Sequence, residues 1–162
     1  MISYQDGNNK FNFRVSAIIL DKSKKFVLIH QIKDRNFWLL PGGRTEMLES
    51  TDSAIARELE EELGIKKCKR KLKIIIENFF QLNQQTYHEL GFSYLVELPK
   101  NSPLFKKEGI FVGIEGEKHL FKWHRIDKLE ELDFRPEFLV KEIKNINKLT
   151  KIKQIIADER TR

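Results

Sequence analysis

The chain has 162 residues, of which 40% are hydrophobic, and a formal net charge of +6 at pH 7. This length suits one domain with a sizeable core and is too short for two ordinary domains, and the apolar fraction argues against a disordered chain. The single cysteine excludes an intrachain disulfide and a zinc site made of thiolates alone. The basic excess favours anionic ligands such as nucleotides. Because no dense basic stripe with interleaved aromatic residues is present, nucleic-acid binding is not expected.

The first ten residues are polar and lack the apolar segment of a signal peptide. The longest apolar runs, such as Ala17–Leu20, have only a few residues, whereas a membrane-spanning helix needs about 20. We therefore expect a protein of the reducing cytoplasm with no membrane partner.

The N-terminal third of the chain predicts two strands and a loop. Val15–Leu20 and Phe26–Gln31 are apolar runs separated by a short polar and charged segment, which favours a hairpin. Phe37–Leu40 is a short apolar run that ends at Pro-Gly-Gly, a combination typical of a loop.

A helix is expected after this loop. Ser50 or Thr51 can cap its N-terminus, the helical pattern continues to about Leu63, and Gly64 is a natural C-terminal stop.

The remainder of the chain predicts three more strands and a second helix. Leu72–Phe80, Gly91–Leu98 and Leu120–Arg125 have the composition of strands, and the apolar pattern becomes helical from Pro136 onward. We expect one α+β domain over residues 1–162, with its core at about 12–148 and a helical tail at 149–162.

Three glutamates of the first predicted helix, Glu58, Glu61 and Glu62, have the spacing i, i+3, i+4. Their carboxylates therefore gather within about a third of the helix circumference, where like charges repel. One interpretation is a solvated acidic face, since charged residues usually face solvent. The other is a site for a hard cation such as Mg²⁺ or Mn²⁺, which takes oxygen ligands.

The residues around these glutamates favour the second interpretation. The segment from Gly42 to Ile65 reads GGRTEMLESTDSAIARELEEELGI. It has glycine, five residues, glutamate, seven residues and then R-E-L-x-E-E-x-G-I, and so it matches every fixed position of the Nudix box. The chain thus resembles the Nudix hydrolases from about Val15 to Ile146. The resemblance implies an α/β/α sandwich with a mixed sheet.

The resemblance also implies a bound magnesium or manganese ion. Carried over by position, the metal ligands would be Glu58, Glu61 and Glu62, with the carbonyl group of Gly42 as a further ligand. The ion would activate a water molecule that attacks phosphorus.

Arg57 would hold Glu49 and Glu58 in place through charge-assisted hydrogen bonds, so that the ligands are preorganised. The chain departs from many family members at Leu48, where they have glycine. This difference affects the shape of the loop and removes no catalytic group.

Nudix enzymes often recruit a further carboxylate from a later loop as a base or ligand. Glu115 and Glu117, in a glycine-flanked segment before the Leu120 strand, are the first candidates, and Glu89 competes with them. Each of the three could equally be a solvent-exposed acid.

Substrate contacts are less well specified by the sequence. Arg14 and Arg44 could clamp a diphosphate, and Phe80 could stack on a base; each has an ordinary surface or core role as its alternative. His30 and His124 belong to no recognisable ligand set and are expected to be structural.

The resemblance implies hydrolysis of a phosphoanhydride bond in a small nucleotide. Our first expectation is a nucleoside diphosphate linked to another group, such as a nucleotide sugar. A pyrophosphohydrolase that removes damaged nucleoside triphosphates and an RNA 5′-end pyrophosphohydrolase are enzymatic alternatives. A nucleotide-sensing module without catalysis is a further alternative, and family members are often homodimers.

Overall fold

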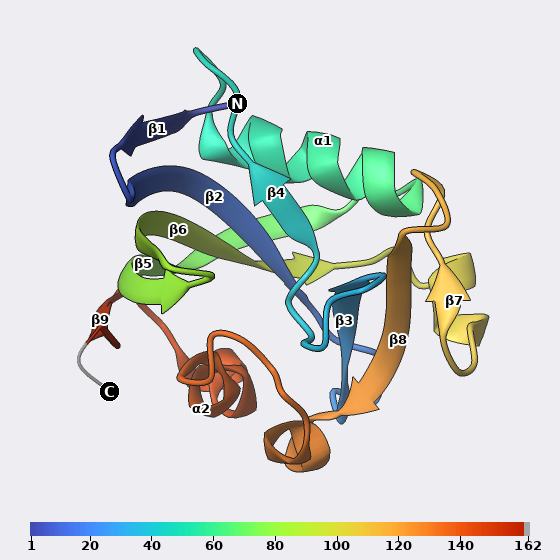
Figure 1. The fold of residues 1–162 in the computed structure, drawn as a ribbon. Helices are drawn as coiled ribbons and strands as arrows, with labels where there is room; N and C mark the ends of the chain where they lie inside the picture. Colours follow the sequence, from blue (N-terminus) through green and yellow to red (C-terminus); the bar gives the residue numbers. More distant parts are fainter. Residues whose placement is uncertain (161–162) are drawn as a thin grey trace.

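The structure is a computed structural model that describes residues 1–160, and a six-stranded mixed sheet forms its centre (Figure 1). Five strands follow one another in the order β1-β2-β6-β5-β9, and β4 pairs with β2. β2 is parallel to β6 and β5 is parallel to β9, whereas the other neighbours are antiparallel. The strands are β1 (Ser3–Asp6), β2 (Asn9–Ile19), β4 (Gly42–Arg44), β5 (Lys69–Leu82), β6 (Gln85–Glu97) and β9 (Lys153–Asp158).

A smaller sheet of three strands lies beside the first, in the order β3-β8-β7. Its strands are β3 (Phe26–Ile32), β7 (Phe111–Val112) and β8 (His119–Arg125). The helices are α1 (Thr51–Leu63) and α2 (Leu139–Lys144), with 3₁₀ turns η1 (Pro103–Lys106), η2 (Ile126–Glu131) and η3 (Ile146–Lys148). In the described part of the chain, no helix has both the length and the apolar character needed to cross a membrane.

The two helices lie on opposite sides of the large sheet (Figure 1). Side chains alternate between the faces of a strand, and β2 shows the consequence. Val15 and Ala17 pack in the core cluster that contains Leu59 of α1, whereas Ile18 packs in the cluster that contains Ile143 of α2. The prediction of an α+β fold with a mixed sheet between helical layers is confirmed.

The predicted first helix is also confirmed, including both ends. The side chain of Ser50 accepts a hydrogen bond from the backbone N–H of Ser53 at 3.1 Å, which satisfies one free donor of the first turn. Gly64 adopts the left-handed conformation with φ of 70°, and its N–H donates to the carbonyl of Glu60. Local sequence determines both caps.

The predicted hairpin between the first two strands is wrong. β3 pairs with β8 in the smaller sheet, and beside the end of β2 it forms a bridge between Leu20 and Val27 and accepts a hydrogen bond from Asp21 at Phe26. Consecutive residues of β3 pack in different clusters, Leu28 with α1 and Ile29 with α2. A strand buried on both faces has no alternating pattern, so its sequence does not specify its partner.

The two ends of the large sheet were not predicted. β1 is fully exposed and polar, which hides the alternation that marks a strand. The predicted helical tail at 149–162 is wrong, because Lys153–Asp158 forms β9 and pairs with β5. Ile155 of this edge strand packs on the cluster beside α2, while Ile156 points to solvent. Residues 161 and 162 of the predicted tail lie outside the described residues.

Candidate active site

One guanidinium group organises the acidic face of α1. The Nε and Nη2 atoms of Arg57 donate to the two carboxylate oxygens of Glu49 at 2.9 and 3.0 Å. Its Nη1 donates to Glu58 at 2.8 Å and to Glu61 at 3.1 Å. The hydrogen bond from Arg57 lowers the pKa of Glu49. Arg57 thus partly neutralises three carboxylates and fixes their positions.

The carboxyl group of Glu58 packs directly against the backbone of Gly43. A Cβ atom on Gly43 would lie 2.4 Å from each of the three carboxyl atoms, so glycine at this position allows the carboxyl group of Glu58 to lie where it does. The burial of Glu58 raises its pKa, although the hydrogen bond from Arg57 opposes the shift. β4 and α1 are therefore joined at the point where the acidic cluster begins.

Glu62 is the most buried carboxyl group of the cluster, with 2% of the residue exposed. It accepts a hydrogen bond of 3.1 Å from the backbone N–H of Gly42. Burial, followed by the nearby charge of Glu58, raises the pKa of Glu62 to about 8. The loop at Gly42 is itself close-packed, because a Cβ atom there would lie 2.2 Å from the carbonyl oxygen of Val15.

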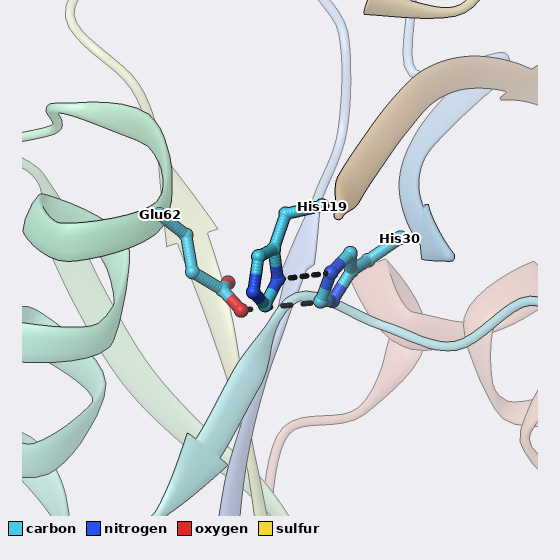
Figure 2. Close-up of side chains that lie close together, drawn as sticks. All are labelled: His30, Glu62 and His119. Carbon is cyan, nitrogen blue, oxygen red and sulfur yellow. Dashed lines mark hydrogen bonds and ion pairs between the residues drawn. The ribbon is translucent and has the colours of Figure 1, made fainter. Parts of the chain in front are cut away.

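Two histidines extend this cluster beyond the helix (Figure 2). Nδ1 of His30 lies 3.6 Å from a carboxylate oxygen of Glu62, and Nε2 of His30 lies 3.0 Å from Nδ1 of His119. Burial lowers the pKa of His30 to about 3, so the ring is neutral and its contact with Glu62 is not an ion pair. His30 thus lies beside a carboxylate of the acidic cluster, in a group whose spacing could hold a metal ion.

The sequence contains little that could have revealed this pair. His30 and His119 are 89 positions apart, and they meet only because β3 pairs with β8. One nitrogen of each ring and one oxygen of Glu62 lie within 4.8 Å of one another, which is close enough to share a metal ion after small movements. His124, the other histidine considered, contacts the carbonyl of Lys128 at 3.2 Å, away from this group.

The structure separates the candidate distal carboxylates. The backbone N–H of Ile114 donates to the carbonyl of Glu62 at 2.9 Å, which ties the loop before β8 to the end of α1. The next residue, Glu115, lies 3.6 Å from His119, and its charge contributes to the raised pKa values of Glu58 and Glu62.

Glu117 is exposed, and within residues 1–160 it forms no hydrogen bond or ion pair. Glu89 lies away from the acidic cluster, in the wall of a cleft.

This cleft has a volume of about 540 Å³ and lies on the face of the large sheet that also carries α2. The predicted substrate residues Arg14, Arg44 and Phe80 all line it. Arg14 on β2 is opposite Arg44 on β4, and within residues 1–160 it has no ion-pair partner. Phe80 stacks on Tyr87 with ring centroids 4.9 Å apart and planes 4° from parallel. The cleft thus combines arginine side chains with an aromatic surface.

The donor set fits a divalent cation. Glu58, Glu61 and Glu62 supply oxygen atoms, the donor type that Mg²⁺ and Mn²⁺ prefer. Arg57 donates hydrogen bonds to Glu58 and Glu61 but not to Glu62. The raised pKa of Glu62 therefore favours the protonated carboxyl group until another positive charge binds nearby. A divalent cation would supply that charge.

Comparisons with known proteins identify the family of this chain. The model of the family described as NUDIX domain matches residues 10–143. A protein of Buchnera aphidicola from Acyrthosiphon pisum, named 8-oxo-dGTP diphosphatase, is 35% identical over 116 residues, which are 72% of this chain and 82% of the relative. A protein of the same name from Buchnera aphidicola of Schizaphis graminum is 26% identical over 127 residues, 77% of this chain and 85% of the relative.

A solved structure has a similar fold. The dihydroneopterin triphosphate pyrophosphohydrolase of E. coli superimposes with a TM-score of 0.60 at 19% identity, covering 85% of this chain and 98% of that one.

Proposed function

Since this chain belongs to the Nudix family of hydrolases, we propose that it cleaves nucleoside triphosphates between the α and β phosphates. The products would be a nucleoside monophosphate and pyrophosphate. The observation that carries the proposal is the position of Arg14 and Arg44, which lie between the aromatic end of the cleft and the buried carboxylate of Glu62. A triphosphate needs such cations along its length.

The choice of a triphosphate draws on the relatives. Both curated relatives are named 8-oxo-dGTP diphosphatase, after a damaged nucleoside triphosphate. This support places the pyrophosphohydrolase ahead of our first expectation, a nucleotide sugar or a related nucleoside diphosphate derivative.

In the proposed mechanism, the cation would be held by Glu58, Glu61 and Glu62. A divalent cation at this position lowers the pKa of water and neutralises phosphate oxygens. Arg57 fixes the orientation of two of the three carboxylates through its hydrogen bonds. The preorganised ligands would then need little rearrangement when substrate arrives.

The remaining residues would act on the substrate and on the proton. Arg14 and Arg44 bind phosphate oxygens, and Phe80 with Tyr87 forms the surface on which the base lies. Water adds to phosphorus as the bond to the leaving pyrophosphate breaks, and a carboxylate accepts the proton. Glu115 is the candidate for this base, because it is exposed to solvent and lies within reach of the cluster.

A substrate panel tests the proposal. The purified protein would be incubated with Mg²⁺ and 8-oxo-dGTP, dGTP, ADP-ribose, a UDP-sugar, a dinucleoside tetraphosphate or 5′-triphosphate RNA, and the products would be separated by chromatography. We expect pyrophosphate and a nucleoside monophosphate from the triphosphates. Turnover in water enriched in ¹⁸O would show which phosphorus is attacked. Cleavage of the UDP-sugar or ADP-ribose with the triphosphates left intact would overturn the proposal.

A further inference from the structure

The floor of the cleft contains a buried polar group with no partner. Asn78 on β5 is 5% exposed, and its Oδ1 atom has no hydrogen bond within residues 1–160. A buried carboxamide without a partner destabilises the folded state, whichever way the amide is turned. Asn78 also lines the cleft. The carboxamide of Asn78 therefore borders the space that a ligand in the cleft would fill.

Asn78 is one member of a polar row across three strands. Asn12 on β2 is opposite Glu89 on β6, and Glu89 is opposite Asn78 on β5. Residues opposite one another share a face of the sheet, and neighbouring strands are about 4.8 Å apart. Asn12 is partly satisfied, because its Oδ1 accepts from Ser3 at 3.1 Å. Glu89 has no ion-pair partner among the described residues. Glu89 and Asn78 thus present adjacent free polar groups.

The polar row of Asn12, Glu89 and Asn78 and the acidic cluster are separated by about the distance between the base and the outer phosphates of a nucleotide. On β2, Arg14 lies two residues after Asn12, and Ser16 lies two residues after Arg14. Ser16 is opposite Gly42, whose backbone N–H donates to Glu62. Four residues of a strand span about 13 Å, roughly the distance from a base to the outer phosphates. In the other direction, Phe80 and Tyr87 follow the row at the next position of the same face.

We propose that Glu89 and Asn78 read the base of the nucleotide and select guanine or its 8-oxo form. This inference rests on the proposed function, because it takes the ligand to be a nucleotide. The carboxylate of Glu89 accepts hydrogen bonds from the N1–H and the 2-amino group, and the amide of Asn78 donates to O6. Both forms of guanine present this edge. Adenine presents an unprotonated N1 to the carboxylate, and hypoxanthine lacks the 2-amino group.

Titration calorimetry with dGMP and dIMP tests the selection without requiring turnover. Wild-type protein should bind dGMP about tenfold or more tightly than dIMP, since a hydrogen bond to a charged group is lost. In Glu89→Gln this ratio should fall toward 1. In Asn78→Leu both nucleotides should bind about tenfold more weakly with the ratio retained, because both have O6.

Two further measurements separate recognition from a structural effect. Glu97→Gln, the same substitution at the exposed end of β6, should retain the wild-type ratio. Asn78→Leu should raise the melting temperature by about 2–6 °C while it weakens binding, because it removes the unpartnered polar group.

An unchanged dGMP-to-dIMP ratio in Glu89→Gln overturns this inference. Preferential binding of dGMP without hydrolysis of any triphosphate would overturn the proposed function and leave the base selection standing.

Discussion

At the residue scale, Arg57 is the cation that positions most of the acidic cluster. Arg57 contacts Glu49, Glu58 and Glu61 at 2.8–3.1 Å. The contacts to Glu49 and Glu58 could be anticipated from the resemblance because all three residues lie in one continuous segment. His30 and His119 could not be anticipated, since only the pairing of β3 with β8 brings them together.

Arg57→Lys should lower kcat by about 10–100-fold, as is typical when a group that orients metal ligands is changed. Lysine keeps the charge but cannot donate to several carboxylates with fixed geometry. The KM for the nucleotide should change little, because Arg57 does not line the cleft. Steady-state kinetics measure both constants. An unchanged kcat would show that the hydrogen bonds of Arg57 do not position the cluster.

The raised pKa of Glu62 predicts how the stability of the metal-free protein depends on pH. Its ordinary value is 4.5, and the folded value is about 8. Below pH 4.5 the group is protonated in both states and contributes nothing to the dependence. Between pH 4.5 and 8 the unfolded chain releases the proton while the folded protein retains it, so stability is lost as pH rises.

The substitution Glu62→Gln removes this loss and keeps an acceptor for Gly42. The variant should therefore exceed wild type in unfolding free energy by an amount that grows from pH 5 to pH 8, reaching on the order of 3 kcal/mol. Denaturant titrations with a chelator present measure the difference. A difference that is constant with pH would contradict the assigned titration.

At the element scale, structure determined by neighbouring residues was predictable and structure determined by distant partners was not. The caps of α1 at Ser50 and Gly64 follow from local chemistry. β9 does not, because its short sequence becomes an edge strand only when β5 is there to pair with it. The cleft combines residues of β2, β5 and β6. From the sequence, Arg14 and Phe80 could therefore be proposed only as separate substrate contacts, and Asn78 could not be proposed.

The junction between β4 and α1 gives a prediction at this scale. In Gly43→Ala the new methyl group would lie 2.4 Å from the carboxyl group of Glu58. The end of this flexible side chain can move away, so the protein should fold with nearly unchanged stability while the displaced ligand lowers kcat by about tenfold or more. Kinetics of a double-mutant cycle with Glu58→Ala provide the check. Full additivity of the two substitutions would contradict the coupling.

At the scale of the whole molecule, the large sheet has the helix that carries the glutamates on one face and the proposed substrate cleft on the other. α1 packs on one face through Ile55 and Leu59, so its glutamates are fixed at the edge of a rigid core. The cleft occupies the other face, beside α2. β4 connects the two regions, because Gly42 donates to Glu62 and Arg44 lines the cleft. The Nudix box predicted the first region residue by residue. The second has no short motif, since its residues come from separate strands.

We propose that the glutamates of α1 bind the divalent cation used for hydrolysis. The most direct measurement is the amount of Mn²⁺ bound, by electron paramagnetic resonance, together with triphosphate turnover in the same samples. Wild type would be compared with Glu61→Gln, Glu62→Gln and, as a control on the same helix, the exposed Glu60→Gln. We predict that wild type and Glu60→Gln bind Mn²⁺ and release pyrophosphate, while the other two variants lose both. Retention of Mn²⁺ binding and turnover in Glu61→Gln and Glu62→Gln would contradict the claim.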